Sequence, residues 1–191
     1  SKTTYISGSH TLLLIKKNKP VFIPAPFIPG SPVFETEDGR FFCGDGKNLY
    51  SIKDTQISFS QSLAVENRYT RLSYYNGTLY VVTGNTVRLF RYHANGFKHF
   101  KTRTFRKTIN LVHVNKYGVW VAFTDEKGVS LYDDYYFNTG YIDVRIPGFV
   151  NYFTNDREGG LWLSTTDNGL FFLPDPAMIS YTATDGLASS V

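Results

Sequence analysis

One stretch of the sequence interleaves basic and aromatic side chains closely enough to hold a charged ligand. Residues 97–107 read FKHFKTRTFRK and contain no acidic residue. This pattern can bind nucleic acid, or sulfated and uronic glycans, through charge and stacking. It also fits the outermost strand of a sheet, with one solvated face, followed by a loop, and we favour this second interpretation. The basic residues are Lys98, Lys101, Arg103, Arg106 and Lys107.

The charge of the whole chain argues against nucleic acid as the partner. The formal net charge is +4, and removing the five basic residues of 97–107 leaves −1 for the rest. We therefore expect no nucleic-acid partner.

Other residue types give no positive sign of catalysis or of a cofactor. The four histidines lack the spacing of metal ligands, so we expect no metal and no cofactor. Cys43, the only cysteine, lies in an apolar run and fits a small buried thiol. Carboxylates from distant parts of the chain could still form a pair for glycan cleavage, so an enzyme stays open as an alternative. The histidines are His10, His93, His99 and His113.

The elements that must position these residues recur along the chain. Four glycines, 38, 41 and 42 residues apart, each precede a short apolar strand, a polar turn and a second apolar strand. They are Gly39, Gly77, Gly118 and Gly160. A partial copy occupies residues 5–15. The spacing suits four short antiparallel strands joined by tight turns, and the 17% of aromatic residues favours sheet.

These repeats predict an all-β fold, a β-propeller of four-stranded antiparallel blades. In the third repeat we expect strands at Ile109–Val114, Val119–Phe123, Val129–Tyr132 and near Tyr141–Arg145. We favour a fragment of a larger propeller of about seven blades over a closed ring of five. The expected ranges are a partial blade at 1–30, blades at about 31–67, 68–107, 108–147 and 148–184, and the start of a further blade at 185–191.

Two further features bear on packing. Trp120 and Trp162 occupy the same position in two repeats, which indicates core residues between blades. The segment 20–32 holds five of the eight prolines, at 20, 24, 26, 29 and 32. Because proline cannot donate to a ladder, we expect an extended connection between blades there.

If the propeller binds a ligand, its geometry indicates one face. The turns between second and third strands share that face with the connections between blades. The predicted ligand-binding residues are those these loops present, although turn propensity explains them equally well. They are Asp45, Lys47, Asn48, Arg68, Asn85, Arg106, Lys107, Asp125, Lys127, Asp167 and Asn168.

The last repeat carries a more specific pattern. Asp156–Phe171, DREGGLWLSTTDNGLF, is similar to a D-x-x-G-x-[LI]-W-[LVI]-[GS]-T unit that leads into a G-[LV]-[YF] strand. Tyr181–Val191, YTATDGLASSV, is similar to the phrase Y/F-T-x-x-D-G-L-x-x-x-V between blades. Both phrases resemble the two-component regulator propeller repeat. The earlier repeats match it only in period and hairpin pattern.

This resemblance implies the extracytoplasmic sensor of a membrane-bound histidine kinase or hybrid regulator of the Bacteroidetes type. It implies a periplasmic location, a homodimeric parent protein and a response to an oligosaccharide. We expect this segment to be non-catalytic and to make no membrane contact of its own. The alternatives are a propeller enzyme acting on polysaccharides, a lyase or hydrolase, and a scaffold for protein contacts.

Overall fold

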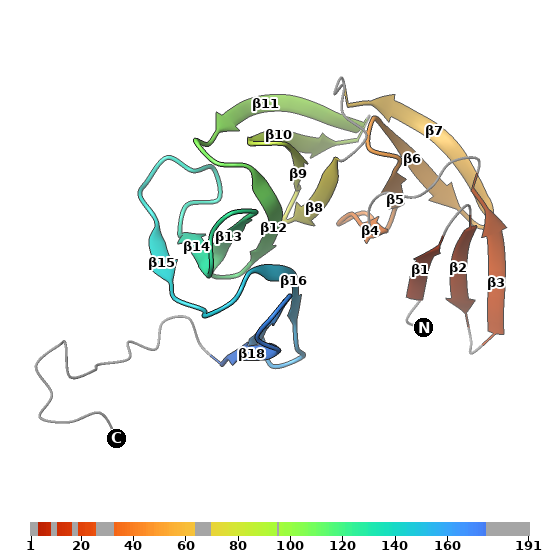
Figure 1. The fold of residues 1–191 in the computed structure, drawn as a ribbon. Coiled ribbons are helices and arrows are strands. Elements are labelled where there is room, and N and C mark those ends of the chain that lie inside the picture. The colour runs from red at the N-terminus through yellow and green to blue at the C-terminus, as the bar shows by residue number, and fades with distance from the viewer. Residues whose placement is uncertain are drawn as a thin grey trace, which may run out of the picture.

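The computed structural model describes residues 4–8, 11–16, 19–25, 33–63, 70–94 and 96–174. Within these ranges the chain forms only strands and turns, and the strands make five antiparallel sheets. Figure 1 shows the sheets fanned one after another around an open arc. The prediction of an all-β propeller built from antiparallel blades is confirmed. No helix in the described part of the chain is long and apolar enough to cross a membrane.

Each sheet is a meander in which consecutive strands pair in chain order. Three sheets have four described strands and two have three. The first sheet contains β1 (Thr4–Gly8), β2 (Thr11–Lys16) and β3 (Lys19–Pro24). The second contains β4 (Phe34–Glu35), β5 (Phe41–Gly44), β6 (Asn48–Lys53) and β7 (Gln56–Ser62). The third contains β8 (Arg71–Tyr75), β9 (Thr78–Thr83), β10 (Thr86–His93) and β11 (Gly96–Thr104). The fourth contains β12 (Ile109–Asn115), β13 (Gly118–Phe123), β14 (Val129–Tyr132) and β15 (Ile142–Val144), and the fifth contains β16 (Val150–Asn155), β17 (Leu161–Thr165) and β18 (Leu170–Leu173).

The first strand of each blade lies on the inner side of the arc. β12 lies against both β8 and β16, the first strands of its two neighbours. The fourth strands, β7, β11 and β15, form the outer rim (Figure 1). The basic segment therefore forms β11, an outermost strand, and the loop after it, as the favoured interpretation predicted.

The core lies between the blades rather than inside one of them. One apolar cluster joins β9 and β10 of the third sheet to β12 and β13 of the fourth, and another joins the fourth sheet to the fifth. Trp120 is fully buried. Trp162 is only half-buried and stacks on Phe172, with ring centroids 4.5 Å apart. The prediction of a core tryptophan is therefore confirmed for Trp120 and met in part for Trp162.

The sequence interpretation of the proline segment is wrong at its start. β3 runs through Pro20 and Pro24, which pair with Ile15 and Thr11 of β2. β3 is an edge strand among the described strands of its sheet, so these two residues need no amide proton for a further ladder there. The prolines at 26, 29 and 32 lie outside the described residues.

Candidate functional site: a groove between two blades

On the predicted face, each described turn between second and third strands is hydrogen-bonded to a connection between blades. The Leu63 amide donates to the Lys47 carbonyl at 2.8 Å, and the Phe105 amide donates to the Asn85 carbonyl at 2.8 Å. The Gly128 amide donates to the Gly148 carbonyl at 3.1 Å. The two kinds of loop therefore lie side by side, and backbone hydrogen bonds hold them together.

Asp45 uses its carboxylate to build the β5–β6 turn. It accepts hydrogen bonds from the backbone amides of Lys47 and Asn48 at 2.8 and 2.7 Å, and from the Tyr50 hydroxyl at 2.8 Å. The Asn48 side-chain amide donates to it as well, at 3.2 Å. Partial burial raises the pKa of Asp45, but these hydrogen bonds outweigh burial, and the pKa lies below its usual value. Asp45 and Asn48 therefore build the turn, and Lys47 is exposed beside it.

Three more of the predicted residues tie turns to the connections beside them. The Asn85 side-chain amide donates to the Phe105 carbonyl at 2.9 Å. The Asn168 side-chain amide donates to the Pro147 carbonyl at 2.9 Å, and Asp167 accepts from the Phe149 amide at 3.4 Å. Turn chemistry accounts for these positions.

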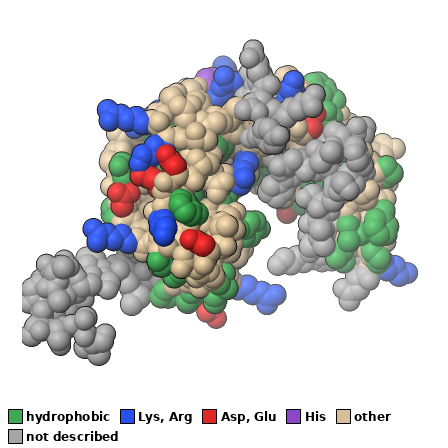
Figure 2. Space-filling view, in the orientation of Figure 1, with side chains coloured by type: hydrophobic (Ala, Val, Ile, Leu, Met, Phe, Trp, Pro, Cys, Tyr) green, Lys and Arg blue, Asp and Glu red, His purple; other side chains and the backbone are tan. Residues whose placement is uncertain are grey.

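The described surface is hollowed where the end of β11 and the following loop face β14 and β15. Two hollows, of about 550 Å³ and about 220 Å³, share Phe123, Glu126, Ser130 and Asp143 in their walls. We call the two together the basic groove. The larger is also lined by Arg103, Thr104, Phe105, Arg106, Lys107, Tyr132 and Tyr141, and the smaller by Lys127, Gly128, Val129, Val144 and Arg145. In Figure 2, basic and acidic side chains gather on the part of the molecule that holds β11, β14 and β15.

Aromatic rings form the inner wall of the basic groove. The Phe105 ring meets Phe123 and Tyr132 edge to face, with centroids 5.8 and 5.9 Å apart, and all three residues are buried. Tyr141 lies against Tyr132 at 5.1 Å but is 56% exposed. Burial raises the pKa of Tyr132, and the neighbouring Tyr141 adds to the shift. The Tyr132 hydroxyl therefore stays protonated at neutral pH and can donate a hydrogen bond.

The long loop between β14 and β15, residues 133–141, is folded onto the protein and places Tyr141. Phe137 is buried, and its ring meets Phe105 and Tyr132 at 5.5 and 5.1 Å. The Asp134 carboxylate accepts the backbone amides of Tyr136 and Asn138 at 2.8 and 2.7 Å.

The same loop is also tied to the third sheet. The Arg91 guanidinium of β10 donates to the Tyr136 hydroxyl at 3.1 Å, and Lys101 of β11 donates to the Asn138 side-chain oxygen. The loop thus links the two blades that form the basic groove.

The charged side chains of the groove differ in how they are already engaged. Lys107 forms an ion pair with Glu126, and the buried Ser130 hydroxyl donates to Asp143 at 2.9 Å. The Arg103 guanidinium lies over the Phe105 ring, 5.6 Å from its centroid.

Two arginines at the groove are exposed and have no ion pair or hydrogen bond with any described residue. They are Arg106, in the loop after β11, and Arg145, just after β15. Their guanidinium groups are available to a ligand that carries acceptor oxygens.

Only part of the predicted site comes together in this groove. Arg106, Lys107 and Lys127 line it, and Asp125 lies in the same β13–β14 turn without lining it. Asn85 lies in the β9–β10 turn of the third sheet but does not line the groove, and Asp45, Lys47, Asn48, Asp167 and Asn168 belong to other blades. Arg68 lies outside the described residues.

Sequence reasoning missed several lining residues that come from strands and from the long loop. Tyr132, Tyr141, Asp143 and Arg145 belong to β14, β15 or their flanks, and no motif distinguishes them. The one usable signal was the unusual length of the aromatic segment between β14 and β15.

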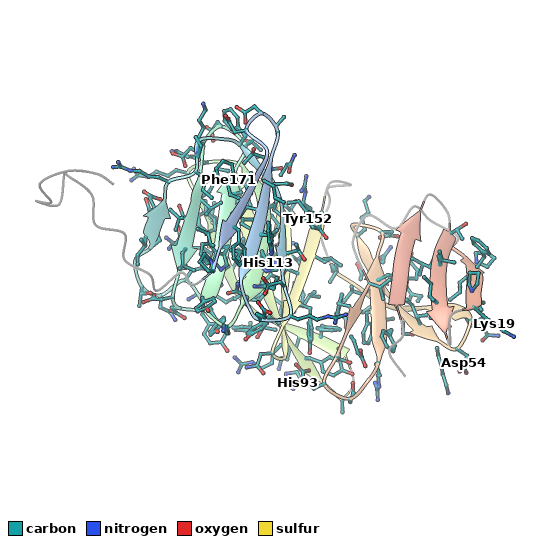
Figure 3. All side chains as sticks on the ribbon, turned by 90° about the horizontal axis from the view of Figure 1, so that it is seen from below. Lys19, Asp54, His93, His113, Tyr152 and Phe171 are labelled. Atoms are coloured by element: carbon teal, nitrogen blue, oxygen red, sulfur yellow. The ribbon has the colours of Figure 1, made fainter. Side chains whose placement is uncertain are left out.

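No metal site emerges within the described ranges. No group of three or more His, Cys, Asp or Glu side chains is placed there to hold an ion. His113 stacks on Phe153 at 5.6 Å, its Nε2 lies 2.6 Å from Asn155 Oδ1, and burial lowers its pKa. Figure 3 shows His93 far from His113. Cys43 is fully buried, and burial raises its pKa to about 12, so its thiol is inert at neutral pH.

Of the two phrases that carry the family resemblance, the one at Asp156–Phe171 begins with a turn, and the one at Tyr181–Val191 lies outside the described residues. Asp156 accepts the backbone amides of Glu158 and Gly160 at 3.0 and 2.8 Å and the Trp162 indole N–H at 3.3 Å. In the preceding blade the Asn115 side-chain oxygen accepts a hydrogen bond from the Trp120 indole N–H at 3.1 Å. An acceptor before the turn and a tryptophan after it thus form a recurring structural unit.

Comparisons with known proteins establish the fold and leave the family open. No family model matches the sequence, and no curated protein matches it. BBS1N in complex with ARL6DN has a TM-score of 0.66 at 17% identity, covering 92% of this chain and 62% of that one.

Two further solved propeller structures are similar in fold to this chain. The WD40 propeller domain of Doa1 has a TM-score of 0.66 at 12% identity, covering 92% of this chain and 62% of that one. Virginiamycin B lyase from Staphylococcus aureus has a TM-score of 0.58 at 15% identity, covering 89% and 64%. The chain is a propeller module.

The chain spans about three fifths of the length of the first solved propellers it matches.

Proposed function

We propose that this propeller module is a non-catalytic, extracytoplasmic sensor that binds an oligosaccharide in the basic groove. The observation that carries the proposal is the composition of that groove. Buried aromatic rings, the exposed Tyr141 and two guanidinium groups without an ion pair, those of Arg103 and Arg106, surround a hollow of about 550 Å³. Polar and charged side chains outnumber aromatic rings in its lining, which suits a ligand rich in hydroxyl groups such as a saccharide.

The position of the groove between two blades suits signalling. Its walls come from the third and fourth sheets and from the loop that Arg91 and Lys101 hold against the third sheet. A ligand there contacts both blades, so it can favour one relative placement of the blades over another. The resemblance of residues 156–171 and 181–191 to regulator propeller repeats supports a periplasmic, homodimeric sensor upstream of a histidine kinase.

Binding and the absence of turnover test this function together. Titration calorimetry of the whole chain against a panel of neutral and acidic oligosaccharides is expected to find at least one saccharide ligand. The Arg106→Ala, Lys107→Ala double variant should weaken it. The recovered saccharide should be intact by mass spectrometry. Unchanged affinity in the double variant would contradict placement in the groove, and cleaved saccharide would contradict the sensor.

A second candidate, a polysaccharide-acting enzyme, has one observation in its favour. Glu126 and Asp143 both line the basic groove, and glycoside hydrolysis commonly uses two carboxyl groups. Their present partners, Lys107 and Ser130, occupy both side chains. If the groove is catalytic, Glu126→Gln and Asp143→Asn should each abolish cleavage while binding persists. The sensor predicts no cleavage by the unaltered chain.

A further inference from the structure

We propose that the basic groove selects an acidic oligosaccharide, one that carries carboxylate or sulfate groups. This inference rests on the proposed function and names its ligand class. Five basic side chains line the groove against two acidic ones. The basic residues are Arg103, Arg106, Lys107, Lys127 and Arg145, and the acidic residues are Glu126 and Asp143.

Both acidic side chains are engaged within the protein. Glu126 is paired with Lys107, and Asp143 accepts a hydrogen bond from Ser130, which is only 5% exposed. Once Lys107 and Glu126 are counted as a pair, four basic groups face one carboxylate. The electrostatic potential in the hollow therefore favours an anion. The low-dielectric walls of the hollow strengthen this attraction.

The basic groups of the groove that have no ion pair include three guanidinium groups, the type that recognises carboxylate and sulfate groups. Arg103, Arg106 and Arg145 have no ion pair with any described residue. A guanidinium group matches the oxygens of a carboxylate or sulfate with two parallel hydrogen bonds. Arg103 is held over the Phe105 ring, so its long side chain has less conformational entropy left to lose when a ligand binds.

A sugar ring fits this hollow better than a run of nucleobases. Tyr141 is the one strongly exposed aromatic ring in the lining, whereas Phe105, Phe123 and Tyr132 are buried and meet edge to face. Single-stranded nucleic acids stack successive bases on several exposed rings. One exposed ring beside guanidinium groups suits a single charged sugar unit flanked by others.

Matched pairs of saccharides separate charge from shape. Calorimetry on the whole chain would compare oligogalacturonate with its methyl ester, and sulfated galactan oligosaccharides with their desulfated forms. We expect at least one charged form to bind about tenfold or more tightly than its neutral partner, the size of one charge-assisted hydrogen bond. Preference within the first pair identifies carboxylate as the recognised group, and preference within the second identifies sulfate.

Single substitutions place the effect in the groove. Arg106→Ala and Arg145→Ala should each weaken the charged form about tenfold and leave the neutral form unchanged. Arg157→Ala, which removes an exposed arginine from the β16–β17 turn on another blade, should change neither. Thermal unfolding and circular dichroism of each variant check that the fold is retained.

The outcomes distinguish this inference from the function on which it rests. Equal affinity for charged and neutral partners overturns the selection of acidic sugars and leaves an oligosaccharide sensor standing. Binding of single-stranded DNA more tightly than any saccharide also overturns the inference. Binding of no saccharide, charged or neutral, contradicts the proposed function itself.

Discussion

Phe137 is the anchor whose removal tests most sharply how the loop at the groove is held. It is 3% exposed, and its ring meets Phe105 and Tyr132 edge to face. Its backbone has a φ of 58°, in the left-handed region. Truncating a buried phenylalanine to alanine costs about 3–5 kcal/mol. We expect about 3 kcal/mol for Phe137→Ala, because a surface loop can partly collapse into the space.

Phe137→Gly should lower the free energy of unfolding less than Phe137→Ala does. This is the reverse of the order usually found for these two substitutions. Alanine keeps the left-handed strain, about 1–2 kcal/mol for an L-residue, whereas glycine relieves it. After allowing for glycine's greater freedom when unfolded, we expect Phe137→Gly to be about 0.5–1 kcal/mol less destabilised than Phe137→Ala. Val114, a buried strand residue of the same cluster, is the control, where glycine should be the worse substitution.

Urea-induced unfolding of the four variants measures these differences in the free energy of unfolding. A loss below about 1 kcal/mol for Phe137→Ala would show that the loop is not anchored through this ring. A glycine variant less stable than the alanine variant at position 137, as expected at Val114, would refute the role assigned to backbone strain.

Three other substitutions or conditions probe the fold. Gly118→Ala places a Cβ 2.1 Å from the Tyr132 carbonyl oxygen and should lower the unfolding midpoint much more than Gly77→Ala, where nothing lies within 4 Å; equal midpoints would refute the close approach. Cys43, with its pKa of about 12, should react with a thiol reagent at pH 8 only after denaturation, and rapid labelling of the native chain would contradict its burial. The pKa of Asp45 is depressed in the fold, so its stabilising effect is fully present above the ordinary value of 3.8 and is lost as pH falls through the folded-state pKa; acid unfolding of Asp45→Asn should show a smaller loss over that range, and an unchanged profile would refute this.

The blade architecture follows from local sequence signals. Turn glycines recur at nearly constant spacing, and each is flanked by short apolar strands whose faces can be buried only against a neighbouring blade. Positions such as Trp120 and strands such as Val129–Tyr132 therefore match expectation. The proline error has a physical cause as well. Pro20 and Pro24 fit in β3 because an edge strand leaves one row of amides unpaired, and the sequence does not state which strand is the edge.

The basic groove depends on contacts that no local pattern encodes. Arg103 and Tyr141 lie 38 residues apart, on different blades, and line the same hollow because the loop between β14 and β15 folds back. The turn residues predicted as ligand-binding are spaced regularly, but Asp45, Asn85 and Asn168 use their side chains to hold loops together. Regular spacing predicted where the turns lie, and the hollow lies where the irregular loop of one blade folds back.

Hydrogen–deuterium exchange of the whole chain with and without a saturating oligosaccharide tests the central claim most directly. Binding in the basic groove predicts slower exchange in three segments, residues 103–107, 126–130 and 141–145, which line it. The β5–β6 and β17–β18 turns should exchange as before. Protection confined to those two turns, or no protection anywhere in the presence of bound saccharide, would contradict the assignment of the groove as the sensing site.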